Sequence, residues 1–317
     1  MKKLLFIVAF TPFVNFASVA DATAAVTVAP TAVQVEAAEA ADDAPPAWLL
    51  IGAGFDLFSA YVWRHSVAND ELVFQPCVWF DITRFKPFYF GGNVWQNWDM
   101  TGSRSGAAPK AMNETDFNLH VGSSLWTSDD EAFALSLELG VDFYTYRQME
   151  GCHDSYEFYA KTVFENPFVN VYGLYAQAYH PVSACYFELG LNKEATLAEL
   201  FESENDILDR LTVGADWSIG FASGKYASNY LYGVIPYGAY DEDAGDYEGW
   251  QSVSDGVGGT TLKANLAYKV CEHFSVGLVL AYTAVLSGDA RDSLEYAGCN
   301  SHYKELVWGG LQAKLEF

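Results

Sequence analysis

AFALSLELGVDFYTYR, residues 132–147, alternates apolar and polar side chains along almost its whole length. An α-helix would place Glu138 and Asp142 beside Leu135 and Leu139, so no continuous apolar stripe could form. A β-strand puts alternate residues on opposite faces and separates the two kinds of side chain. The stretch is therefore predicted to be a strand with one apolar and one polar face.

The same period of two recurs along the chain from Trp48 onward. Most of the segments reach the ~9–11 residues with which a tilted strand crosses a bilayer. Strands of a soluble β-sandwich, the competing interpretation, are usually shorter, at ~5–6 residues. We count twelve segments, at 49–64, 71–82, 87–99, 114–126, 132–147, 155–164, 168–180, 184–193, 207–221, 258–270, 273–287 and 302–317. The expected fold is all-β: an antiparallel transmembrane β-barrel of about twelve strands.

A thirteenth candidate strand lies at 225–240. Barrels of this kind have an even number of strands when both chain ends lie on the periplasmic side. We therefore assign residues 222–257 to one long external loop, with room for a hairpin above the membrane. The segment 194–206 is expected to be a longer periplasmic connection with a short helix.

The first residues have the pattern of an export signal. Lys2 and Lys3 precede the apolar run 4–10, and Ser18-Val19-Ala20 supplies small residues for cleavage after Ala20. Residues 21–47 are rich in Ala, Val, Thr and Pro and contain no aromatic residue. The predicted organisation is thus a signal peptide at 1–20, a disordered periplasmic tail at 21–47 and the barrel at 48–317.

Charge and cysteine content restrict the partners. The formal net charge of −24 argues against nucleic-acid binding, which needs a basic surface. The acidity either attracts cations or simply keeps an exported protein soluble and its loops mutually repulsive. The five cysteines show no CxxC spacing, so zinc binding is not expected. Cys152 and Cys299 both fall in expected external loops, and a disulfide between them is a hypothesis based on the oxidising compartment.

The last residues repeat the alternation up to the end of the chain. Leu311, Ala313, Leu315 and Phe317 form one apolar face of the final strand. Outer-membrane barrels typically end in this way, on a terminal Phe that resembles the signal read by the barrel-assembly machinery. We expect the protein to lie in the outer membrane, with lipid and that machinery as partners.

Several runs resemble the TorF-type porin family (the Gcw_chp group). They are FDLFSAYVWRHSVANDELVFQPCVWFDI, FYFGGNVWQNWD, ETDFNLHVG, LELGVDFYTYRQ and YEFYA. The resemblance covers residues 55–192 well and 258–317 only in style, and His65 stands where the family usually has Gly. It implies a porin fold more strongly than any substrate. The matching residues are Tyr61, Arg64, Gln75, Trp95, Glu114, Asp116, Tyr144, Tyr146 and Glu157.

If the apolar faces meet lipid, alternation assigns the polar side chains to the lumen. The alternative to an open pore is that these groups pair across a narrow lumen and fill it, as Arg64 could do with Glu71 or Asp56, and Lys161 with Glu138 or Glu157. Trp79, Trp95 and Tyr144 could alternatively form a sugar-stacking track. The expected lumen-lining residues are Asp56, Arg64, Glu71, Gln75, Asn93, Glu114, Asp116, His120, Glu138, Asp142, Glu157, Lys161, Glu188, Asp216 and Lys263.

The function we predict is a porin-like channel for passive diffusion of small cationic or neutral solutes, without a cofactor or a bound metal. The first alternative is a non-conducting barrel that serves structure or recognition through its external loops. The second is a barrel enzyme. No catalytic residue is assigned. GxSxG is absent, and in the run His153-Asp154-Ser155 adjacent strand residues would point to opposite faces and be poorly placed to act together. The sequence leaves open the solute and the state of the lumen.

Overall fold

The computed structural model describes residues 48–101, 111–146, 154–232, 234–241, 246–296 and 304–317. The predicted signal peptide, the predicted tail and the proposed Cys152–Cys299 disulfide all fall outside these residues. Within them, Cys77, Cys185 and Cys271 are free thiols.

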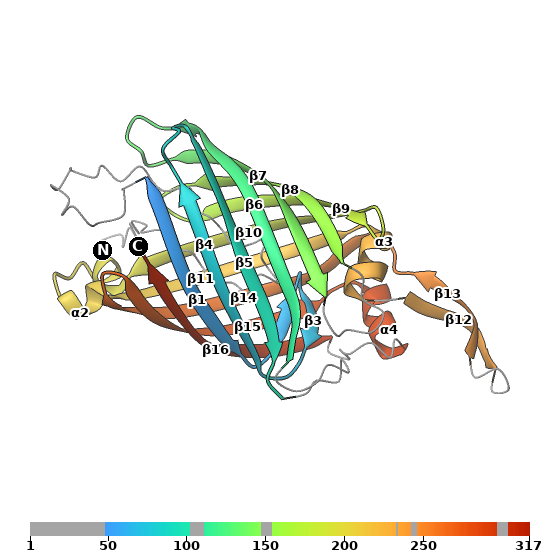
Figure 1. The fold of residues 1–317 in the computed structure, drawn as a ribbon. Helices are drawn as coiled ribbons and strands as arrows, with labels where there is room; N and C mark the ends of the chain where they lie inside the picture. Colours follow the sequence, from blue (N-terminus) through green and yellow to red (C-terminus); the bar gives the residue numbers. More distant parts are fainter. Residues whose placement is uncertain (1–47, 102–110, 147–153, 233, 242–245, 297–303) are drawn as a thin grey trace, which may run out of the picture.

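Twelve antiparallel strands close into one barrel, which confirms the predicted fold (Figure 1). Consecutive barrel strands are hydrogen-bonded neighbours, and β1 closes the ring by pairing with β16. The barrel strands are β1 (Leu49–Phe58), β4 (Val73–Ile82), β5 (Phe88–Asp99), β6 (Ala111–Thr127), β7 (Ala134–Tyr146), β8 (Ser155–Glu165), β9 (Asn170–His180), β10 (Ala184–Thr196), β11 (Leu211–Ala222), β14 (Gly256–Cys271), β15 (Phe274–Val285) and β16 (Glu305–Glu316).

The two faces of the wall have the chemistry that the alternation predicts. On β7, Leu139 and Phe143 are 48% and 42% exposed on the outer surface, whereas Glu138 and Asp142 are buried on the inner one. Outward apolar side chains of the other strands are exposed in the same way. An apolar outer belt around a polar interior is what a membrane-spanning barrel requires. Among the described residues, no helix is long and apolar enough to cross a membrane.

The two ends of the barrel differ in their connections. At the turn end, short links such as 83–87, 128–133 and 272–273 join neighbouring strands. The expected helical connection is also there, as α1 (Leu197–Leu200) and α2 (Asp206–Asp209). Thr196 caps α1 with a capping box and Asn205 caps α2, so each short helix begins at a side chain that accepts backbone N–H groups. The long connections gather at the opposite loop end.

The predicted strand 49–64 is wrong in its second half. The barrel strand β1 ends at Phe58, and the chain then forms a separate hairpin of β2 (Tyr61–Trp63) and β3 (Ser66–Asn69). Arg64 and His65 at its tip have positive φ angles of 47° and 66°. Two consecutive left-handed residues make a tight hairpin turn whose twist suits the flanking strands, and this reverses the chain.

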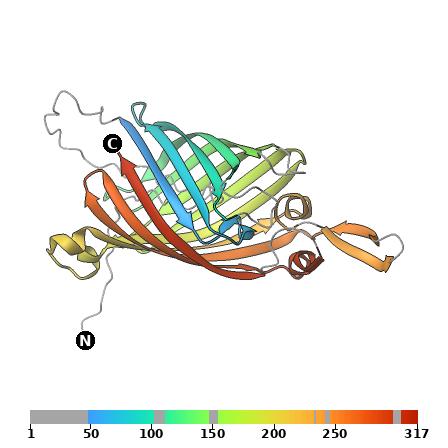
Figure 2. The same ribbon diagram turned by 60° about the horizontal axis from the view of Figure 1, so that its bottom comes forward.

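The loop end carries the remaining elements. Residues 225–240 add no strand to the barrel, as parity requires. They form α3 (Gly224–Tyr226), the π-helix η2 (Ala227–Leu231) and β12 (Val234–Asp241), which pairs with β13 (Asp246–Ser252) in a separate hairpin. Figure 2 shows this hairpin projecting beyond the barrel, with α3 and α4 (Gly288–Tyr296) at the barrel rim. Tyr226, Ala290 and Leu294 pack there into a buried apolar cluster with the inner face of the wall.

Candidate functional site: a hairpin across an acidic lumen

The β2–β3 hairpin folds into the barrel and touches strands far apart on the wall. At its base, the Asn69 amide donates to the Asp99 carboxylate of β5 at 2.5 Å. At its tip, His65 contacts Thr261 of β14, with 2.7 Å between Nδ1 and Oγ1. Ser66 donates to the backbone carbonyl of Leu231 in η2 at 2.8 Å. The hairpin therefore bridges the lumen between β5 and β14.

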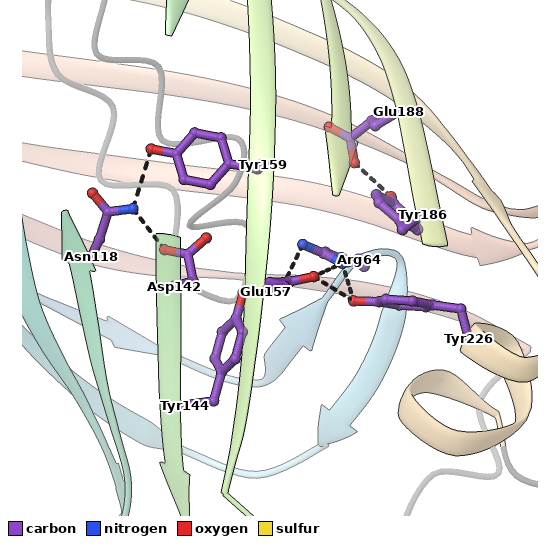
Figure 3. A network of polar contacts seen from close by, with 9 residues as sticks. All are labelled: Arg64, Asn118, Asp142, Tyr144, Glu157, Tyr159, Tyr186, Glu188 and Tyr226. Atoms are coloured by element: carbon purple, nitrogen blue, oxygen red, sulfur yellow. Dashed lines mark hydrogen bonds and ion pairs between the residues drawn. The ribbon is translucent and has the colours of Figure 1, made fainter. Parts of the chain in front are cut away.

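Arg64 is the centre of the contacts at the tip (Figure 3). Its guanidinium donates two hydrogen bonds to Glu157 of β8, at 3.0 and 2.8 Å. The Tyr226 hydroxyl accepts a hydrogen bond from the Arg64 guanidinium and donates one to the Glu157 carboxylate. The guanidinium carbon of Arg64 lies 4.5 Å from the centre of the Tyr186 ring. Both charged side chains are essentially inaccessible to solvent, so this is a buried two-pronged ion pair.

His65 forms the second anchor. Its Nε2 lies 3.2 Å from the Glu188 carboxylate of β10. A Cβ at Gly220 or Gly259 would come within 2.7 Å of the His65 side chain, so glycine at both positions makes room for the ring. A nucleophile–base–acid group of an enzyme could have the composition of Thr261, His65 and Glu188. Thr261, however, is fully buried, and its hydroxyl also contacts the hydroxyl of Thr283. In this setting the three residues hold the hairpin in place.

Four lumen glutamates each receive the hydroxyls of two tyrosines. Tyr89 and Tyr159 donate to Glu138 at 2.9 Å each, and Tyr172 and Tyr186 donate to Glu188 at 3.1 and 2.7 Å. The remaining pairs are Tyr144 and Tyr226 at Glu157, and Tyr61 and Tyr146 at Glu114. Hydrogen bonds of this kind satisfy carboxylates that have lost their water.

Glycines on the neighbouring strand make room for these rings. Tyr89 faces Gly122, Tyr159 faces Gly140 and Tyr172 faces Gly190. At each of these glycines, a Cβ would fall within 2.1–2.4 Å of the nearest ring atom. The absence of a side chain lets the ring lie flat along the wall with its hydroxyl directed at the glutamate.

Most of the expected lumen residues lie on the inner face of the wall. Asp56 accepts from Gln312 at 3.0 Å, and Gln75 donates to Asn97 at 2.9 Å. His120 meets Asn118 at 2.8 Å and Asp81 at 3.0 Å. The other expected residues that the barrel strands carry inward are Asn93, Glu114, Asp116, Glu138, Asp142, Glu157, Lys161, Glu188, Asp216 and Lys263.

The two expected ion pairs differ from the structure. Arg64 pairs with Glu157, not with Glu71 or Asp56, because the hairpin turn carries it away from the wall of β1. Glu71 lies between β3 and β4, where its carboxylate accepts from Thr101 at the loop end. Lys161 is opposite Glu138 in the β7–β8 register, but its ammonium makes no hydrogen bond to any described residue and lies 5.6 Å from the centre of the Tyr172 ring.

The aromatic residues of the alternative sugar track are engaged in packing. Trp79 covers Gly52 and lies under the Lys314 ammonium, 5.5 Å away. Trp95 packs against Tyr61 of the hairpin, with ring centres 5.6 Å apart, and is 1% exposed. Trp79, Trp95 and Tyr144 are 8%, 1% and 3% exposed, so in the described part of the chain these rings are covered by their neighbours.

A cavity of about 320 Å³ opens at the turn end. Thr212 and Lys314 belong to its inner wall, while Cys271, Glu272 and His273 come from the β14–β15 turn. Inner-wall residues therefore border a cavity at the turn end, whereas the hairpin crosses the lumen nearer the loop end (Figure 1).

Sequence reasoning did not assign the tyrosines to the glutamates. The available signal was the spacing of two residues, which places side chains on the same face of a strand. Tyr144 lies two residues after Asp142, Tyr159 two after Glu157, and Tyr186 two before Glu188. The hairpin itself had no such signal, because Tyr61–Arg64 continues the period of two.

No protein-family model matches the chain, and no curated protein matches it either. Membership of the TorF-type family therefore stays a prediction. Similar solved structures do exist, at low sequence identity.

One is the KdgM porin in complex with disordered oligogalacturonate, at 10% identity and a TM-score of 0.41, over 84% of this chain and 99% of that chain. A second is an outer membrane channel from Pseudomonas putida F1, at 9% identity and a TM-score of 0.45, over 88% and 99%. A third is outer membrane phospholipase A from Escherichia coli, at 11% identity and a TM-score of 0.41, over 88% and 94%. The three similar structures are thus of a porin, an outer membrane channel and an outer membrane phospholipase, each matched over most of this chain.

Proposed function

We propose that the protein is an outer-membrane porin-like channel through which small cationic or neutral solutes diffuse passively. The observation that carries the proposal is the closed twelve-stranded wall with an apolar outer face and a polar, acidic inner face. A barrel of this size lies between small filled barrels and the wide ~16–18-strand porins. The passage is therefore narrow, and its charged lining acts at close range.

The charge of the lining supports a preference for cations. Among the described residues, ten buried carboxylate side chains face three buried Lys and Arg side chains. Fixed charges of one sign in a narrow aqueous space raise the local concentration of counter-ions. The buried carboxylates are Asp56, Asp81, Asp99, Glu114, Asp116, Glu138, Asp142, Glu157, Glu188 and Glu194, and the cations are Arg64, Lys161 and Lys314.

Single-channel recording in planar bilayers tests the proposal. We expect small unitary currents in KCl and, under a KCl gradient, a reversal potential of the sign that K⁺ permeation gives. Silence of both the wild-type protein and a variant without the hairpin, across salts and voltages, would refute conduction. A reversal potential of the opposite sign would refute the cation preference.

The second candidate is a non-conducting barrel that acts through its loop end. The observation that favours it is the bridge formed by Arg64, Glu157 and His65 across the lumen. The β12–β13 hairpin would then be the recognition element, because it projects from the barrel (Figure 1). The wild-type protein decides between the two candidates. Wild-type currents favour the channel, whereas wild-type silence together with currents from the hairpin-free variant favours a barrel closed by the bridge.

A further inference from the structure

Asp116, near the middle of β6, differs from the other lumen acids. It is 2% exposed, and neither of its carboxylate oxygens has a hydrogen-bond partner among the residues that the structure describes. Asp142 on the adjacent strand β7 is equally buried. Its Oδ1 accepts from Asn118 at 2.7 Å, but its Oδ2 has no hydrogen-bond partner in the described part of the chain. Three carboxylate oxygens on two neighbouring strands are thus dehydrated and unsatisfied.

These oxygens lie where the hairpin meets the wall. In the strand register, Asp116 is directly opposite Trp95 of β5 on one side and Tyr144 of β7 on the other. Tyr61 of the hairpin packs on Trp95 and Trp63 packs on Tyr144, with ring centres 5.6 and 5.8 Å apart. Asp116 therefore lies between two aromatic contacts at the constriction, the level at which the hairpin crosses the lumen.

The surrounding charge favours a cation at this point. The carboxylates of Glu114, Asp142 and Glu157 act electrostatically on Asp116. Arg64 is already engaged by both oxygens of Glu157. A buried carboxylate without a counter-charge is costly, and a bound cation removes both the desolvation cost and the repulsion between the acids.

We propose that Asp116 and Asp142 bind a small monovalent cation at the constriction, between the hairpin and the β5–β7 wall. Carboxylate oxygens replace the water of such a cation, and the flanking aromatic faces attract it further. A single charge is preferred because, within the described ranges, no three His, Cys, Asp or Glu side chains converge as metal ligands do. The site gives the proposed cation preference a location. Its role in conduction rests on the proposed channel function, but the binding of a cation there does not.

Equilibrium stability tests the site without any current. The full chain in detergent is unfolded by heat in KCl, NaCl or NH₄Cl and, at the same ionic strength, in N-methylglucamine chloride, whose cation is too large to enter. For the wild-type protein we expect a saturable rise in the midpoint of about 5 °C with a small cation. Asp116→Asn and Asp142→Asn should lose most of this rise. Asp129→Asn, at an exposed turn residue, should keep it.

The outcomes separate the two proposals. Equal midpoints in small-cation and large-cation salts, or equal shifts in the wild-type protein and both lumen variants, would overturn the site. Asp142→Asn keeps the test decisive if Asp116→Asn does not fold. If the unfolding midpoint shows a saturable shift that depends on Asp116 but the protein conducts under no condition, the cation site is supported and the channel function is refuted.

Discussion

At the scale of single residues, charge in this lumen is held by specific partners. Arg64 lies in the hairpin turn and not in a strand. The turn places its side chain against Glu157, which is 93 positions further along the chain. Removing one member of a buried ion pair leaves the other charged and dehydrated, which costs far more than the pair contributes. The contacts of Arg64 can therefore be tested by stability.

Arg64→Ala should lower the free energy of unfolding by about 3–5 kcal/mol, because Glu157 would remain buried without its counter-charge. Urea unfolding of the detergent-solubilised barrel measures the loss. Arg64→Met combined with Glu157→Gln should recover most of it, since no uncompensated charge remains. Arg210→Ala, at an exposed residue of the turn end, is the control and should change stability little. An effect of Arg64→Ala no larger than the control's would contradict the assignment.

Gly140→Ala should destabilise the barrel by about 1–3 kcal/mol, because its Cβ would fall 2.4 Å from the Tyr159 ring and displace the hydroxyl from Glu138. Gly173→Ala is a matched control, also in a strand, whose Cβ would meet its nearest atom at 3.6 Å. Unfolding midpoints of the two variants provide the comparison. Equal midpoints would show that the ring has room to move.

At the scale of elements, the sequence predicts the wall well and the lumen contents poorly. The alternation in 132–147 marks β7 to within two residues at its start and one at its end, because one face must be apolar along the whole crossing. Residues 59–64 were predicted to continue the first strand, but their pairing is decided by the turn at Arg64–His65 and by contacts to β8, β10 and β14. Such long-range contacts leave no local period to detect.

Replacing residues 60–70 by a Gly-Ser linker should raise the single-channel conductance several-fold, because the hairpin is what bridges the lumen. The barrel should still close, since Phe58 and Val73, on either side of the segment, already face each other in the β1–β4 register. Shortening the β12–β13 hairpin, which lies outside the barrel, is the control and should leave conductance near the wild-type level. Unchanged conductance in the first variant would mean that the constriction lies elsewhere.

At the scale of the whole molecule, closure depends on the two ends of the barrel sequence. Phe317 donates its N–H to Ile51 at 2.8 Å and accepts the N–H of Ile51 at 3.0 Å, and its ring stacks on His273. The apolar face Leu311, Ala313, Leu315 and Phe317 was predicted from the sequence as an assembly signal. The structure adds a backbone pairing that any residue could make.

Phe317→Ala should therefore reduce assembly in cells several-fold and affect refolding in detergent much less, because the backbone pairing survives the substitution. Heat-modifiable mobility in gels measures the folded fraction in both settings. Phe317→Tyr is the control and should assemble normally. Equal loss in cells and in detergent would assign the residue to stability instead of recognition.

The docking of the hairpin tip has a consequence for the order of folding. His65 meets Thr261, 196 residues later, and Arg64 and Ser66 meet residues 162 and 165 positions ahead of them. Contacts between such distant parts of a chain form slowly, because a large loop must close first. The last of these partners, on β14, is in place only after most of the wall has been built. We therefore expect the hairpin tip to dock after most of the wall has formed, so that its docking depends on a nearly complete barrel.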